Sequence, residues 1–152
     1  MSSSKIAAKL AQSYADIQAL LDQVDMELVV YENPVWQVRD VIWHLSVWDR
    51  QVTQSIEAFQ SGGQYAIPDF DEINFNKVSI EESRQLTGEQ VEEESRQARR
   101  RFIAAVERFS EGQLESDFLY PWGDESGNVI QLVDYMVEHD EEHRQEIISA
   151  AN

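Results

Sequence analysis

This chain of 152 residues contains only three histidines, and their spacing could place them around one metal ion. His139 and His143 are four residues apart, and residues at that spacing share one face of a helix. His44 comes three residues after Val41 and four before Trp48, so it belongs to the apolar stripe of an upstream helix. Two imidazoles on consecutive turns and a third from a facing helix can bind one divalent ion. Three protein ligands leave coordination positions open, which is typical of a catalytic rather than a structural metal site.

An ordinary structural role for these histidines stays open on the pattern alone. With three histidines in this length, a spacing of four arises by chance in roughly one chain in twenty-five. A single histidine on an apolar face is more often a hydrogen-bonded core residue than a ligand. All three fall on predicted buried stripes, and this coincidence favours a metal site without excluding the core role.

Two other metal motifs fit the sequence poorly. The segment "HDEEH" is similar to the zinc-protease helix HExxH, but Asp140 stands where that motif has its catalytic glutamate. A di-iron bundle needs two Glu-x-x-His motifs, and Met136 stands three residues before His139. We expect the acidic residues between the two histidines of this segment to face solvent.

Composition narrows the functional classes. The chain has no cysteine, so any thiol nucleophile has to come from a cofactor. Its net charge of -17 disfavours nucleic acid and anionic membrane surfaces as partners. The arginines at 99–101 are expected to balance nearby glutamates rather than to bind an anion. We find no secretory signal and no apolar run of membrane-spanning length, and therefore expect a cytoplasmic protein.

The segments that must position the histidines are predicted to be helices. The chain has only six glycines and three prolines, and its 42% hydrophobic residues suffice for one core, so we expect a single domain over residues 1–152. Asn33 is expected to cap the second helix, with Pro34 in its first turn. The fold class is therefore all-α, a four-helix bundle with a long crossover connection between the second and third long helices. Apolar periodicity predicts five helices, at residues 3–24, 34–60, 72–85, 88–109 and 128 to near the C-terminus.

Two aromatic residues flank the histidines on the same predicted stripes. Trp48 comes four residues after His44, and Tyr135 comes four before His139. Both are candidates for the wall of a pocket, although a place in the core is the commoner role for such aromatics. The loop 120–128, "YPWGDESGN", directly precedes the last helix and is placed to rim the same pocket.

Two motifs resemble those of a known family, the DinB-like superfamily of metalloenzymes. The segment "WQVRDVIWHLSVWDRQV" resembles the family's second-helix motif, and "HDEEHRQEI" resembles its last-helix motif HxxxHxxxI. The segment 68–94 is similar to the connector of the branch that contains ClbS/DfsB and mycothiol-dependent maleylpyruvate isomerase-like proteins. The resemblance covers residues 36–147. It implies a four-helix bundle of up-down-down-up type, with a metal bound by His44, His139 and His143.

The resemblance also sets an expectation for function. Characterised relatives include thiol-dependent transferases and isomerases, and a hydrolase that opens a strained ring. We therefore expect an enzyme that depends on a divalent metal (zinc, nickel or iron) and acts on a small molecule as a hydrolase or thiol-dependent S-transferase, with a low-molecular-weight thiol as a candidate cofactor. The alternative is a non-catalytic metal-binding or protein-interaction module of the same fold. A homodimer is expected only because dimers are the commonest assembly.

Overall fold

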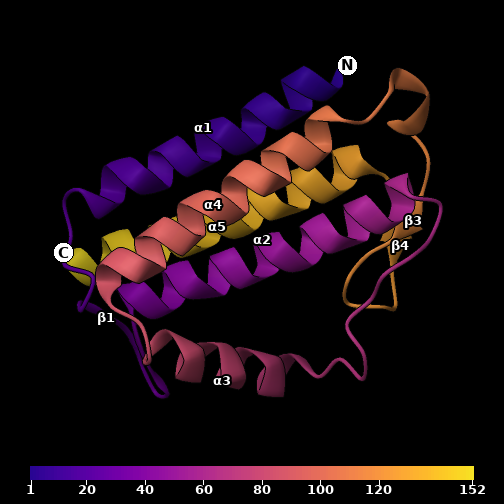
Figure 1. Ribbon diagram of the computed structural model, residues 1–152. Coiled ribbons are helices and arrows are strands. Elements are labelled where there is room, and N and C mark those ends of the chain that lie inside the picture. Colours follow the sequence, from indigo (N-terminus) through magenta and orange to yellow (C-terminus); the bar gives the residue numbers. More distant parts are fainter.

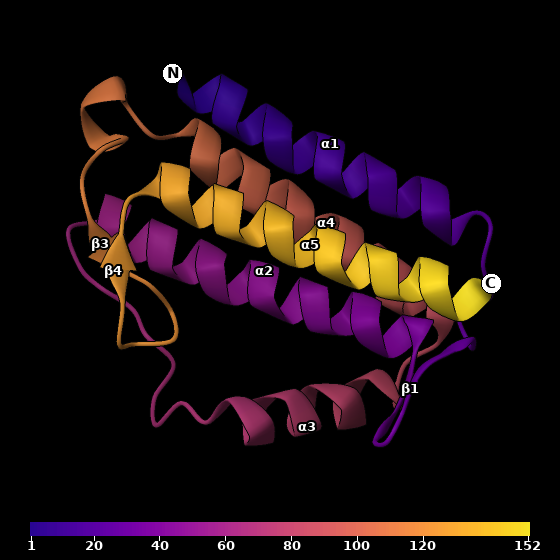
Figure 2. The ribbon, with the colours of Figure 1, turned by 180° about the vertical axis from the view of Figure 1, so that it is seen from behind.

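Four long helices lie side by side in the computed structural model, which describes residues 1–152 (Figures 1 and 2). The first and last, α1 and α5, run in one direction, and α2 and α4 run in the other (Figure 1). Their bounds are Ser3–Leu21 for α1, Val38–Gln60 for α2, Gly88–Glu107 for α4 and Val129–Ala151 for α5. The prediction of a mainly helical fold is confirmed. No helix is both long enough and apolar enough to cross a membrane.

The last helix begins as its sequence predicts. The Asn128 side chain accepts a hydrogen bond from the amide of Gln131, and the Gln131 side chain accepts one from the amide of Asn128. This reciprocal cap satisfies two amides that have no partner within the helix. It fixes the first turn of α5, three turns before the histidine pair.

The second helix begins four residues later than predicted, at Val38 rather than Pro34. Asn33 and Pro34 instead form the turn between two short strands, β1 (Val29–Glu32) and β2 (Val35–Gln37). A proline fits a tight turn as well as it fits a first helical turn, so the local signal did not decide between them. Pairing of the aromatic side chains across the strands favours the hairpin, because the rings of Tyr31 and Trp36 meet edge to face at 5.5 Å.

The crossover connection contains the predicted short helix, α3 (Glu72–Ser83). It lies beside α2 on the side away from α1 (Figure 2). Asp40, in the first turn of α2, is fully buried and holds the C-terminal end of α3 in place. Its carboxylate accepts hydrogen bonds from the Ser83 hydroxyl at 2.8 Å and from the Arg84 guanidinium at 3.0 Å.

A second small hairpin lies within the loop that precedes α5. Its strands are β3 (Phe118–Leu119) and β4 (Ser126–Gly127), and a short 3-10 turn at Glu111–Gln113 comes before them. The two hairpins correct the prediction of a purely helical chain. Strands of two to four residues are too short to leave an alternating pattern in the sequence.

The interior combines an apolar core with one buried ion-pair network. Arg99 of α4 is 2% exposed, and its guanidinium contacts Asp49 of α2 and Asp140 of α5. The same guanidinium donates to the Leu10 carbonyl of α1, and the Ser13 hydroxyl donates to Asp140. Two predictions were therefore wrong, because Arg99 does not balance surface glutamates and Asp140 does not face solvent. The largest fully buried apolar side chains are Ile6, Leu10, Ile42, Ile56, Phe102, Leu132 and Ile147.

Candidate metal centre

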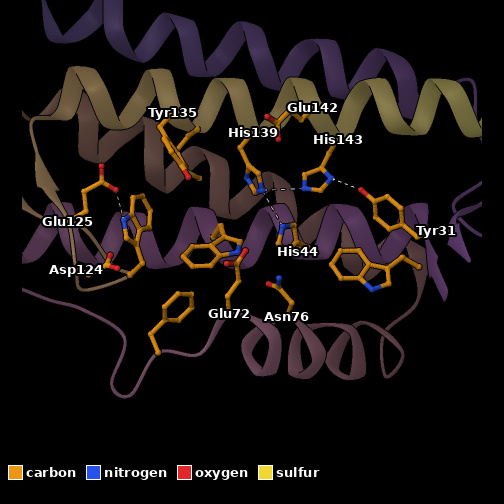
Figure 3. A pocket seen from close by; sticks show the side chains of 15 residues that line it. Tyr31, His44, Glu72, Asn76, Asp124, Glu125, Tyr135, His139, Glu142 and His143 are labelled. Carbon is orange, nitrogen blue, oxygen red and sulfur yellow. Dashed lines mark hydrogen bonds between the residues drawn. The ribbon is translucent and has the colours of Figure 1, made fainter. Parts of the chain in front are cut away.

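The three histidines meet between α2 and α5. His44 comes from α2, and His139 and His143 come from consecutive turns of α5 (Figure 3). The Nε2 atom of His139 lies 3.3 Å from that of His44 and 3.2 Å from that of His143. The structure thus brings together the three residues that the sequence singled out.

These distances suit the ligand shell of a metal ion. Nitrogen ligands about 2.0–2.1 Å from an ion lie about 3.3–3.4 Å apart at tetrahedral angles and about 2.9 Å apart at right angles. The two separations from Nε2 of His139 are close to the tetrahedral value, and the ligand atoms of all three histidines lie within 4.8 Å of one another. An imidazole nitrogen offers either one hydrogen or one lone pair, so Nε2 of His139 can form a good hydrogen bond with only one of its two neighbours. A cation in the centre would satisfy all three nitrogens together.

Burial keeps the histidines neutral, as metal ligands must be. Burial, together with a smaller effect of the two neighbouring histidines, lowers the pKa of His44 to about 2. The pKa of His139 falls to about 4, mainly through burial and then through His143. Burial also lowers the pKa of His143, against the pull of Glu146 and Asp140. At neutral pH each ring therefore keeps a lone pair on one nitrogen.

His143 is oriented by two residues beyond the cluster. Its Nδ1 lies 3.1 Å from the Tyr31 hydroxyl and 3.3 Å from a carboxylate oxygen of Glu146. The Tyr31 hydroxyl donates in turn to Glu146. Burial and Glu146 raise the pKa of Tyr31, so this hydroxyl keeps its proton at neutral pH. A hydrogen on Nδ1 of His143 would then point to these acceptors and leave Nε2 free for the centre of the cluster.

His44 has a different neighbour on its outer side. Asn76 of α3 lies next to its ring (Figure 3) and opposes the lowering of its pKa. Nδ1 of His44 and Oδ1 of Asn76 are both buried, and neither has a well-formed hydrogen-bond partner. A hydrogen bond donated by Nδ1 to Oδ1 would satisfy both atoms. That bond would fix the tautomer of His44 with Nε2 directed to the cluster.

The cluster opens into a pocket of about 620 Å³. Five parts of the chain build its wall: α2 and α5, α3 with the residues before it, the β1–β2 hairpin at one end and the loop between β3 and β4 at the other. The carboxylates of Asp124 and Glu125 lie at the loop end, and Tyr31 lies at the opposite end (Figure 3). The lining residues other than the histidines are Tyr31, Trp36, Trp48, Phe70, Glu72, Asn76, Trp122, Asp124, Glu125, Tyr135, Met136 and Glu142.

Both aromatic pocket candidates line this pocket, as does the predicted rim loop. Trp48 is 9% exposed and also belongs to the core, whereas Tyr135 is 55% exposed. Tyr31, Trp36 and Asn76 were missed. Tyr31 and Trp36 approach the histidines only because of the β1–β2 hairpin, and Asn76 only because α3 folds back onto α2. No spacing within one helix could reveal these approaches.

Comparison with known proteins identifies the family of this chain. A model of the DinB superfamily matches residues 6–147, which is nearly the whole chain. The protein belongs to the DinB superfamily. A search among curated proteins gave no match.

Solved structures show the same DinB fold at low sequence identity. A mycothiol-dependent maleylpyruvate isomerase superposes with a TM-score of 0.76 at 13% identity, over 97% of this chain. This chain spans only 61% of that isomerase. An uncharacterised protein from Clostridium difficile 630 gives a TM-score of 0.78 at 12% identity, covering 98% of this chain and 95% of the other. A protein from Streptococcus pneumoniae gives 0.73 at 14% identity, covering 98% and 90%.

Proposed function

We propose that this protein is an enzyme that depends on a divalent metal and acts on a small molecule, as a hydrolase or a thiol-dependent S-transferase. One observation carries the proposal: three neutral imidazoles from α2 and α5, with ligand nitrogens within 4.8 Å of one another, line one pocket. The scaffold that we assign to this activity is the up-down-down-up four-helix bundle expected for the family.

The residues present fit a divalent ion. Three imidazole nitrogens suit zinc, nickel and iron alike. When bound, such an ion would act as a Lewis acid that lowers the pKa of a water or a thiol at an open position. His44, His139 and His143 would hold it. Tyr31 and Glu146 keep the third of these rings in its orientation.

Carboxylates of the pocket are available for proton transfer. Glu142 follows His139 by three residues on α5, and Glu72 projects from the start of α3; both line the pocket beside the cluster (Figure 3). Either carboxylate could accept the proton that a water or thiol loses as it becomes a nucleophile. Trp48 and Trp36 add apolar surface to the wall beside the histidines.

A low-molecular-weight thiol is the candidate cosubstrate. The chain has no cysteine of its own, so an S-transfer reaction needs a thiol from outside. One protein of the same fold is named for its dependence on mycothiol. A pocket of about 620 Å³ is large enough for such a molecule or for its reaction partner.

Metal analysis tests the first part of this proposal. The purified protein is exposed separately to zinc, nickel, iron and manganese, desalted and analysed by mass spectrometry. One ion per chain is expected, and His139→Ala should lose it. Glu138→Ala provides the matched control, because Glu138 is an exposed neighbour on α5 that does not line the pocket. Failure of all four metals to bind would refute the proposal.

A turnover screen tests the second part. The metal-loaded protein is incubated with bacillithiol, mycothiol or glutathione and a panel of electrophiles, and without thiol with strained-ring and ester substrates. His44→Ala should abolish any turnover that appears. Turnover that survives this substitution would contradict the proposed site. Bound metal with no turnover of any class would favour the non-catalytic module.

A further inference from the structure

The pocket above the histidines has a one-sided charge. Every charged side chain in its wall other than the histidines is a carboxylate, and no lysine or arginine lines it. Cationic residues do line a second cavity, between α2 and α4, where Arg50 and Arg101 take part in the wall. The carboxylates of the main pocket are Glu72, Asp124, Glu125 and Glu142.

The loop end of the pocket also has a cluster of aromatic rings, called the aromatic box below. The ring of Trp122 lies 5.4 Å from that of Tyr135 and 6.1 Å from that of Trp48, and Trp48 lies 5.6 Å from Phe70. The indole Nε1 of Trp122 donates to Glu125 at 2.8 Å. This bond fixes the orientation of the indole and holds a carboxylate next to it.

We propose that the substrate carries a cationic group, such as a substituted ammonium, which binds in this aromatic box while the reacting group sits at the histidines. Aromatic faces and nearby carboxylates both attract a cation, and both repel a carboxylate or phosphate group. The inference rests on the proposed function for the position of the reacting group.

The carboxylates at this end do not serve the histidine cluster. Asp124 and Glu125 lie at the far end of the pocket from His143, beside Tyr135 (Figure 3). The histidines and the aromatic residues of this end line one continuous pocket of about 620 Å³. The pocket can therefore receive a molecule that spans from the histidines to the box.

Three probes of the same shape and different charge test the proposal. They are choline, its neutral isostere 3,3-dimethylbutan-1-ol and the anion 3,3-dimethylbutanoate. Dissociation constants are measured on the metal-free protein at low ionic strength, from tryptophan fluorescence and from the indole signals in NMR. Choline should bind about tenfold more tightly than the neutral probe, and the anion should bind least. Equal or tighter binding of the neutral or anionic probe would overturn the proposal.

Two variants locate the cation. Glu125→Gln keeps an acceptor for Trp122 Nε1 but removes the charge, so it should weaken choline binding several-fold and leave the neutral probe unaffected. Trp122→Leu should weaken choline binding as well. Glu115→Gln is the control, because Glu115 is exposed, lies outside the pocket and forms no ion pair with a lysine or arginine. An equal loss in this control would assign the effect to overall charge and refute the box.

The result of the probe-binding experiment can be distinguished from the result of the metal analysis. Probe binding uses the metal-free protein, so a preference for choline stands whether or not the histidines bind an ion. A protein that binds metal but prefers the anionic probe would keep the proposed function and refute the cationic substrate.

Discussion

The buried arginine gives the sharpest prediction about stability. All five N–H groups of the Arg99 guanidinium are used, with four hydrogen bonds to the two carboxylates and one to the Leu10 carbonyl. Arg99→Met keeps much of the apolar stem and leaves Asp49 and Asp140 buried without their counterion. Burial already raises the pKa of Asp49, and Arg99 opposes that rise. In the variant we therefore expect at least one carboxyl to take up a proton on folding.

The loss of folding stability in Arg99→Met can be estimated from the uptake of that proton. Neutralising a carboxyl with an ordinary pKa of about 3.9 costs about 4 kcal/mol at pH 7 and about 1.5 kcal/mol at pH 5. The first value agrees with the roughly 3–5 kcal/mol that removal of one partner from a buried ion pair costs. A pKa that is higher in the folded state than in the unfolded state gives stability that is lost as the pH rises. The deficit of the variant should therefore be largest at pH 7 and shrink toward pH 5.

Urea unfolding followed by circular dichroism measures this deficit at both pH values against the parent protein. Arg100→Met is the matched control, because Arg100 is the exposed neighbour of Arg99 on α4. A triple variant that also carries Asp49→Asn and Asp140→Asn should regain part of the lost stability, since no buried charge remains. A deficit of equal size at pH 5 and pH 7, or one no larger than that of the control, would refute the reasoning.

Three further predictions concern the histidines and their supports. The pKa of His139 is about 4 in the folded protein and about 6.5 in the unfolded chain, so the metal-free protein takes up a proton at this residue on unfolding. Its stability should therefore fall by on the order of 3 kcal/mol from this residue as the pH falls from 6.5 to 4. His139→Gln should show a smaller loss of stability in urea titrations at acid pH. Tyr31→Phe should weaken metal binding about 10–100-fold with little change in unfolding, as measured by competition with a chelator. Asp40→Asn should cost about 2 kcal/mol by weakening the bonds to Ser83 and Arg84, and faster hydrogen exchange confined to α3 and its flanks would support it.

Helical periodicity predicted the features that depend on residue spacing within a single helix. The five helices and the approach of His139 and His143 follow from spacing, because one face of a helix is set by the chain itself. The position of His44 opposite this pair depends on a second helix, α2. The apolar stripe of α2 indicated which face of that helix would be buried. The turn at Asn33 and Pro34 was misassigned, because the same residues begin a helix or close a hairpin.

Contacts between elements were not predictable in this way. Asp140 lies in a run of acidic residues whose other members mostly face solvent, and only the position of Arg99 on a neighbouring helix explains its burial. Asn76 carries no sequence signal, because its relation to His44 depends on how the crossover folds back. The family resemblance supplied the pairing of the histidines but none of these supporting contacts.

The histidines lie on the long helices, whereas part of the pocket wall comes from the crossover. This separation bears on how such a protein can change its substrate. The three imidazoles stand on α2 and α5, inside the helical bundle, whereas Phe70, Glu72 and Asn76 reach the pocket from the crossover. The crossover is attached to α2 at one end through Asp40 and carries little of the core. Substitutions at Phe70 and Glu72 can reshape the pocket while the imidazole geometry stays fixed, whereas Asn76 lies next to His44. Descendants of one ancestral bundle could therefore acquire new substrates without rebuilding the centre.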